Sequence, residues 1–211
     1  MREDLEQQEQ IDAIKGFWND NKRWIIPFVT LLLAAAVAFN GWNWYSARQA
    51  AQASDALAAM EGALIEQNAE KSRVAYNVLA ADFGGTAQAA VAGLQMAKVH
   101  VSNGELAQAR GVLEVVTKKA PEEFAWIARV RLAGVMLDEE NAQGALAAVA
   151  GNPPKDYLPL VLDRRGDAHA ALGQKEEARA AWKAALDGLD PQSPTRGLVL
   201  RKLQTIDSFG G

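Results

Sequence analysis

The chain has 211 residues, no cysteine and a formal charge of −4 at pH 7, from 22 basic and 26 acidic side chains. The lack of cysteine excludes disulfides, thiol catalysis and cysteine metal sites, and the slightly acidic balance is not that of a nucleic-acid-binding protein. Long alanine-rich stretches favour helices, so the composition predicts an all-α protein.

The stretch Ile25–Tyr45 carries no charged residue. At a rise of about 1.5 Å per residue, a helix of this length covers roughly 31 Å, which matches a hydrocarbon core about 30 Å thick. Because lipid offers no partner for backbone polar groups, a single span must be helical. We therefore predict a leader over residues 1–23 and one transmembrane helix over residues 24–45, with Pro27 in the first turn of that helix.

Amphipathic aromatic side chains mark both ends of the predicted span. They are enriched at membrane–water interfaces, where they contact lipid headgroups. The four predicted membrane anchors are Trp24 at one end and Trp42, Trp44 and Tyr45 at the other.

Basic residues near the span predict its orientation. Four basic residues precede the span: Arg2, Lys15, Lys22 and Arg23. In the twenty or so residues that follow it, Arg48 is the only basic residue. This bias predicts a cytoplasmic N-terminus in a bacterial inner membrane and a periplasmic C-terminal part. A signal peptide cleaved at Ala51-Gln52-Ala53 is the alternative, but the long leader and the distance of that site from the apolar run favour a retained span.

The leader has one narrow apolar face, formed by Ile11, Ile14 and Trp18 at helical spacing. A helix resting on the lipid headgroups explains this face, and a docking helix for a cytosolic partner is the alternative.

After the span, residues 46–68 are predicted to form a stalk and first helix that pack on the helices that follow, through apolar positions at steps of three and four: Ala53, Leu57, Met60 and Leu64. A second helix is expected over Lys71–Phe83, with Val74, Val78 and Leu79 on its apolar side. Thr86 is the expected cap of the next helix.

Residues 69–211 are predicted to form a tetratricopeptide-like α-solenoid of antiparallel helix pairs. In Pro159–Gln192, small residues and turn glycines fall close to the repeat pattern of about 34 residues. Ala90–Glu123 repeats this pattern two periods upstream, and Trp126–Asn152 supplies a weakly matching middle unit. Pro153-Pro154 breaks the chain before the last unit, and Thr195–Ile206 is expected to cap the stack.

His100 and His169, the only histidines, occupy the same position of two repeats. Repeat stacking would hold them too far apart to share one metal ion, so we interpret both as structural and expect them to fill equivalent spaces between helices. Known catalytic and phosphate-binding motifs are absent from the sequence, and no acid, base and nucleophile set can be assembled. We expect no enzyme activity, catalytic residue, cofactor or metal.

The chain resembles the YfgM family, tetratricopeptide-like ancillary subunits of the bacterial Sec translocon. The segments that carry the resemblance are EQIDAIKGFWNDNKR in the leader, GWNWYSARQA at the exit of the span and DRRGDAHAALGQKEEARAAW in the last repeat. The resemblance implies a protein beside the translocon channel subunits, associated with a membrane-anchored periplasmic chaperone of prolyl-isomerase type, that helps to pass translocated polypeptides to periplasmic chaperones. It also implies a second role of the leader, linked to a cytoplasmic stress-response regulator.

If the first helix of each repeat lines the concave side, the wall there would bind a partner segment or a translocating polypeptide. The predicted groove residues are Leu94, Lys98, Val101, Ile127, Val130, Leu137, Leu160, Asp163 and Asp167. For any one of the six apolar positions a core role is the alternative. A scaffold for an envelope or cell-wall assembly complex is the alternative function.

Overall fold

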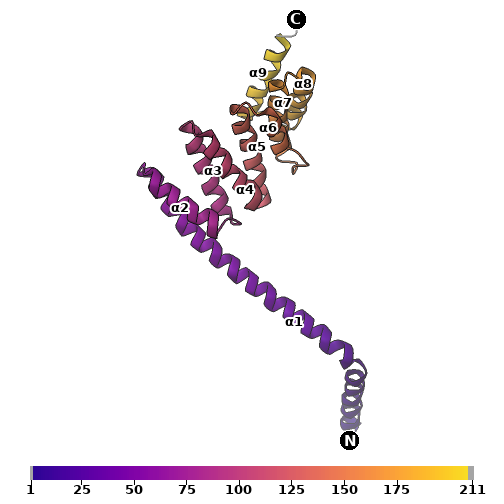
Figure 1. The fold of residues 1–211 in the computed structure, drawn as a ribbon. Helices are drawn as coiled ribbons and strands as arrows, with labels where there is room; N and C mark the ends of the chain where they lie inside the picture. Colours follow the sequence, from indigo (N-terminus) through magenta and orange to yellow (C-terminus); the bar gives the residue numbers. More distant parts are fainter. Residues whose placement is uncertain (1, 209–211) are drawn as a thin grey trace. The chain divides into compact units, whose positions relative to one another are not determined.

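The computed structural model describes residues 2–208, with side chains described for residues 10–208. Within these residues the chain is helical and has no strand, so the predicted all-α class is confirmed. The chain divides between Arg48 and Gln49 into two compact units. Helix α1 (Arg2–Ile65) begins in the first unit and ends in the second, and all further helices belong to the second unit (Figure 1).

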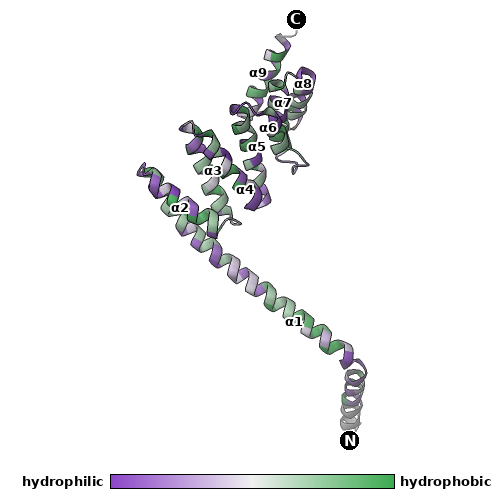
Figure 2. Cartoon of the chain, in the orientation of Figure 1, coloured by the Kyte–Doolittle hydropathy of each residue, from purple (hydrophilic) through white to green (hydrophobic). Residues whose placement is uncertain are grey.

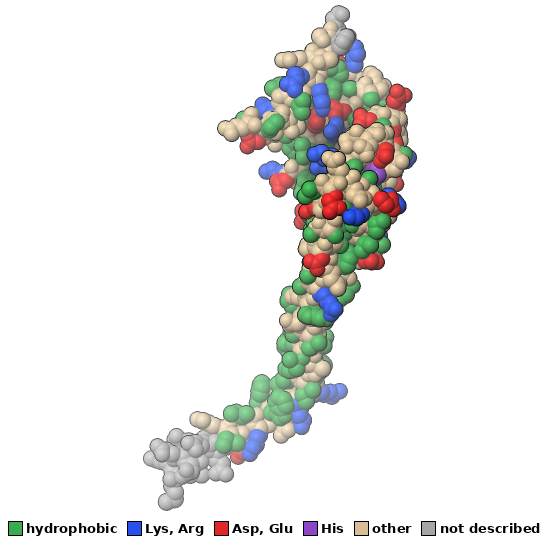
Figure 3. All heavy atoms as spheres, turned by 90° about the vertical axis from the view of Figure 1, so that its left-hand side faces the viewer, with side chains coloured by type: hydrophobic (Ala, Val, Ile, Leu, Met, Phe, Trp, Pro, Cys, Tyr) green, Lys and Arg blue, Asp and Glu red, His purple; other side chains and the backbone are tan. Residues whose placement is uncertain are grey.

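The part of α1 in the first unit is apolar and exposed. It contains the one candidate membrane span among the described residues, and none of its most apolar window is buried by protein. Figure 2 shows the hydrophobic residues along this part of the helix, and Figure 3 shows Lys and Arg side chains toward its N-terminal end. Such a surface is stable only when lipid or another apolar surface covers it.

The expected position of Pro27 is wrong. The leader and the span form one continuous helix, so Pro27 lies inside α1 rather than in a first turn. Proline has no N–H to donate to the carbonyl four residues earlier, here that of Arg23, and such positions weaken or bend a helix. The leader therefore meets the span at a point where the helical hydrogen-bond ladder lacks one member.

The second unit is a series of helix pairs. The end of α1 pairs with α2 (Ala69–Asp82), α3 (Ala87–Ser102) with α4 (Leu106–Lys119), α5 (Glu122–Asp138) with α6 (Ala142–Ala148), and α7 (Leu158–Ala171) with α8 (Lys175–Gly188). Figure 1 shows these pairs following one another in chain order. Helix α9 (Pro194–Ser208) packs on α8. The three predicted units and the closing helix are confirmed, and the end of α1 with α2 adds a fourth pair.

All four pairs turn in the same way. The backbone N–H of the residue that precedes or caps the second helix donates to a carbonyl five residues earlier: Asn68 to Ala63 (2.9 Å), Glu105 to His100 (2.8 Å), Asn141 to Met136 (2.7 Å) and Gln174 to His169 (2.9 Å). The residue before each donor has a positive φ, 55° at Gln67, 74° at Gly104, 60° at Glu140 and 74° at Gly173. This left-handed residue and six-to-one hydrogen bond form a Schellman ending, which satisfies carbonyls that a helix end leaves open.

The two histidines lie at this turn. His100 Nδ1 is 2.6 Å from Glu105 Oε2, and His169 Nδ1 is 2.6 Å from Gln174 Oε1. Each side chain thus ties the end of one helix to the start of the next, which differs from the expected filling of space between helices. The expected equivalence of the two positions is confirmed.

Small residues let paired helices approach closely. A Cβ added to Gly166 would collide with the indole of Trp182, and one added to Gly93 would collide with Val116. Ala109 and Ala178 are fully buried at equivalent positions of α4 and α8. The core is therefore a chain of clusters, each shared by neighbouring helices, as expected of a repeat protein.

The apolar side predicted for α2 is confirmed at Leu79 and wrong at the two valines. Val74 and Val78 are exposed, whereas Ser72, Tyr76 and Leu79 are buried. Tyr76 and Leu79 belong to a cluster that includes Ala53 and Met60 of α1, so the expected packing of residues 46–68 on later helices is confirmed. Thr86 caps α3 by accepting a hydrogen bond from the N–H of Ala89, as expected.

Candidate partner-binding groove

A groove of about 400 Å³ crosses the first helices of three successive pairs, α3, α5 and α7. Its floor is apolar and buried, formed by Ala97, Leu113 and Val135. Its sides carry one exposed apolar residue, a glycine and four charged residues: Val101, Gly134, Lys98, Arg131, Asp138 and Arg164. The groove can thus accept a polypeptide with both apolar contacts and charge pairing.

The structure brings Lys98 and Val101, two of the sequence-predicted wall residues, together in this groove. Leu94 is buried in the core instead, where it packs with α4 and α5. Ile127, Val130 and Leu137 are partly buried against core clusters, and Leu160 is half-buried in α7. Most of the predicted apolar wall therefore faces other helices.

Asp163 and Asp167 are held by α9. Lys202 Nζ lies 2.6 Å from Asp163 Oδ1 and 2.7 Å from Asp167 Oδ1. The indole N–H of Trp182 donates to the Asp163 carbonyl and to Asp167, both at 3.2 Å. The two carboxylates thus anchor the closing helix to the last repeat, and neither lines the groove.

Burial raises the pKa of Asp163, although the nearby Lys202 ammonium opposes the shift. Desolvation disfavours the charged carboxylate, and the negative charge of Asp167 adds to this effect. The free-energy cost of burying Asp163 in its charged form therefore depends on pH.

The groove is rich in basic side chains. The Arg131 guanidinium donates through Nη1 to the Leu94 carbonyl at 3.2 Å, and Arg164 pairs with Asp167 at 3.0 Å. Among residues 10–208, neither Lys98 nor Arg131 has a carboxylate within ion-pair distance. Asp138 is the one acidic residue that lines the groove. The site therefore favours an anionic partner group.

Arg131, Gly134, Asp138 and Arg164 were missed by the sequence reasoning. The turn that the helix pairs share aligns the repeats, and this alignment identifies three of them. The position five residues before His100, Met136 and His169 is occupied by Gln95, Arg131 and Arg164, respectively. Lys98, Gly134 and Asp167 occupy another, so the predicted pair Lys98 and Asp167 already pointed to Gly134. The signal was hidden because the middle repeat has Met136 and Glu140 where the others have histidine and glycine.

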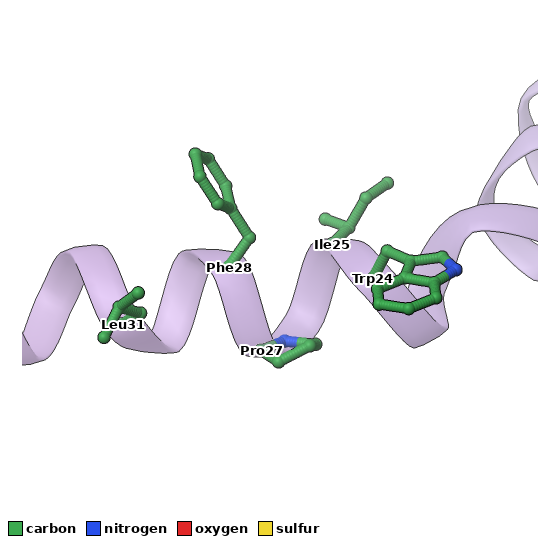
Figure 4. A pocket seen from close by; sticks show the side chains of 5 residues that line it. All are labelled: Trp24, Ile25, Pro27, Phe28 and Leu31. Carbon is green, nitrogen blue, oxygen red and sulfur yellow. The ribbon is translucent and has the colours of Figure 1, made fainter.

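The four predicted membrane anchors are strongly exposed in the first unit. Arg48 lies over the Trp44 ring at 5.5 Å, and the Trp42 and Tyr45 rings are 6.3 Å apart. At the other end, Trp24, Ile25, Phe28 and Leu31 surround an open apolar notch beside Pro27 (Figure 4). Aromatic and aliphatic side chains around an open notch suit lipid chains or a neighbouring apolar helix.

In the described residues no cluster of three or more His, Asp or Glu side chains could hold a metal ion. The fold defines a class, that of helical-repeat proteins whose described residues include one helix able to span a membrane.

The comparison with protein families specifies this class. The model of the tetratricopeptide repeat-like domain matches residues 15–208, so the chain belongs to that family. The chain is also 28% identical to the ancillary SecYEG translocon subunit of Neisseria gonorrhoeae, over 96% of this chain and 98% of that protein. The proteins of the same name from Escherichia coli and Aggregatibacter actinomycetemcomitans are each 27% identical, over 85% and 86% of this chain and 87% and 89% of theirs. The resemblance noted in the sequence is confirmed.

Proposed function

We propose that this protein is a membrane-anchored interaction subunit of the Sec translocon and has no enzyme activity. The observation that carries the proposal is that the similarity to ancillary SecYEG translocon subunits covers nearly the whole chain, the candidate span as well as the repeats. The candidate span supports a role at a membrane, and the repeats support binding of another polypeptide there.

The proposed topology is single-pass in the bacterial inner membrane, with residues 1–23 cytoplasmic and the repeats periplasmic. The excess of basic residues before the span supports it. Protease added to spheroplasts should digest residues 46–211 and leave the leader intact. Protection of the repeats would contradict this orientation.

The groove across α3, α5 and α7 is the proposed contact surface. Its occupant would be a segment of a channel subunit, of a membrane-anchored chaperone of prolyl-isomerase type, or of a translocating polypeptide. By holding such segments beside the channel exit, the subunit would help to pass translocated chains to periplasmic chaperones. Exposed Val101 and the basic rim support this assignment because buried core positions cannot reach a partner.

Crosslinking in intact membranes tests the proposal. A photoreactive amino acid at Val101 should capture translocon channel subunits or their chaperone, and one at Val78 serves as the control. Both valines are similarly exposed, at 39% and 43%, but Val78 lies on α2 outside the groove. Capture of cell-wall or envelope assembly enzymes from Val101 would favour the scaffold function instead. Equal capture from both positions would contradict the groove assignment.

A further inference from the structure

Gly134 occupies the interior of α5 without a packing reason. Glycine in a helix interior is less stable than alanine because it loses more backbone entropy on folding. The three atoms nearest to an added Cβ all belong to the Arg164 guanidinium, at 3.6 Å for Cζ, 3.7 Å for Nη2 and 3.8 Å for Nε, which are ordinary contact distances. Gly166 differs, because its Cβ would collide with Trp182. Gly134 thus leaves a gap in the groove wall that close packing does not require.

The Arg164 guanidinium borders this gap with unused donors. Nη1 donates to Asp167 at 3.0 Å, and Nε is buried without a hydrogen-bond partner. Nη2 adjoins the gap and donates to no protein acceptor among residues 10–208. About a third of the side chain is exposed, so a ligand in the groove can reach the terminal nitrogens. A buried or half-buried guanidinium with open donors favours an anionic acceptor.

Two further cations share the groove. Lys98 and Arg131 are exposed, and in the described part of the chain neither has a carboxylate partner. Asp138 is the opposing acid at the rim. The groove therefore concentrates positive charge in a chain whose net charge is −4. Such a local field attracts carboxylates and repels basic segments.

We propose that the groove recognises an acidic side chain within an extended partner segment. Its carboxylate enters the gap beside Gly134 and accepts hydrogen bonds from Arg164 Nη2 and from Arg131. The next apolar side chain of the segment contacts Val101. Because the groove crosses three helices, the partner chain can continue on both sides of the acidic residue, which favours an internal residue over a chain terminus. This inference rests on the groove binding proposed above and specifies the chemistry of its occupant.

Retention of defined peptides by the full chain in lipid nanodiscs tests the inference. The probes are N-acetylated, C-amidated nine-residue peptides with a central Glu, Asp, Gln or Lys and with Val, Ser, Thr or Gly elsewhere. A set with central Gln and a free C-terminal carboxylate separates internal from terminal acids. The Glu and Asp peptides should be retained about tenfold better than the Gln peptides, and the Lys peptides least, as one charge-assisted contact allows. Equal retention of Glu and Gln peptides overturns the inference, as does preference for the terminal carboxylate.

Variants assign the effect to the gap. Arg164→Gln and Gly134→Leu should each abolish the preference for Glu over Gln, because one removes the donor and the other fills the gap. Lys183→Gln and Gly111→Leu are the matched controls, since both residues are exposed on the second helix of a repeat and outside the groove. Far-UV circular dichroism verifies that each variant is folded. If both groove variants keep the preference, the inference fails. Continued capture of translocon subunits from Val101 in that case would leave the proposed function intact.

Discussion

The α7–α8 and α5–α6 pairs share their turn but differ in what fills the space between and beside their helices. In α7–α8, Gly166 admits the indole of Trp182, and Asp163 and Asp167 bind Lys202 of α9. In α5–α6 the second helix spans only Ala142–Ala148, and Gly134 leaves a gap instead of a contact. One repeat thus uses its small residue and its carboxylates to pack the closing helix, whereas the repeat before it leaves space beside its glycine.

The largest expected effect is in the closed repeat. Trp182 is nearly fully buried and contacts α7 and α9, so Trp182→Ala should lower the free energy of unfolding by about 3–5 kcal/mol. Urea unfolding of the full chain in detergent micelles, followed by far-UV circular dichroism, measures it. Leu200→Ala, at an exposed apolar position of α9, should change stability little. Equal losses in the two variants would refute the assigned role of Trp182.

One substitution should have opposite effects in the two repeats. Gly166→Ala should destabilise by about 1–3 kcal/mol because its Cβ collides with the rigid indole. Gly134→Ala should stabilise by about 0.5–1 kcal/mol because its Cβ fits and alanine favours helix. The same urea experiment compares the two variants directly. A loss of stability in both would mean that Gly134 is also a packing residue.

The turns offer a second paired test. Glu140 has a φ of 60°, a conformation that costs a residue with a Cβ about 1 kcal/mol, so Glu140→Gly should raise the thermal midpoint of unfolding. Gly173→Ala, at the equivalent position with a φ of 74°, should lower it by a similar amount. Differential scanning calorimetry of both variants checks the signs. A lower midpoint for Glu140→Gly would show that its side chain stabilises the turn.

The smallest expected effect depends on pH and belongs to the network that closes the stack. Burial raises the pKa of Asp163, so the folded protein binds its proton more tightly than the unfolded chain does. The contribution of Asp163 to stability is then fully present below the unfolded pKa of about 3.9 and falls as pH rises through the folded pKa. Asp163→Asn should remove this slope. The midpoints of urea unfolding of the original chain and of Asp163→Asn, compared from pH 3.5 to 7, measure this slope. A difference between the two midpoints that does not vary with pH would contradict the raised pKa of Asp163. Asp156→Asn, in an exposed loop, is the control.

Local patterns were enough to predict several elements. The helix α2, the cap at Thr86 and the pairs α3–α4 and α7–α8 followed from residue spacing and turn chemistry, because these depend on neighbours along the chain. The two helices of the first pair were predicted, but their membership in the repeat series was not, because Gln67 replaces the turn glycine and α1 continues without a break from the span. Similarly, Val74 and Val78 were predicted on the apolar side of α2 together with Leu79, but the neighbouring helices bury only Leu79 of the three.

The groove shows the same limit. Lys98 and Val101 were predicted, but Leu94 and the pair of Asp163 and Asp167 could not be placed from the sequence, because their surroundings come from other helices. Repeat register alone aligns Arg131 with Arg164. It does not show that one donates to a backbone carbonyl and the other borders a gap.

The sequence by itself determined that the chain is helical, that residues 24–45 can span a membrane and that repeats follow. Helix propensity, apolar length and periodicity act through neighbours along the chain or through the bulk solvent. Only the tertiary structure decided which apolar residues are buried, which charges are paired and where Gly134 leaves a gap. These properties arise between side chains on different helices, where small differences in side-chain volume decide whether two helices pack closely or leave space.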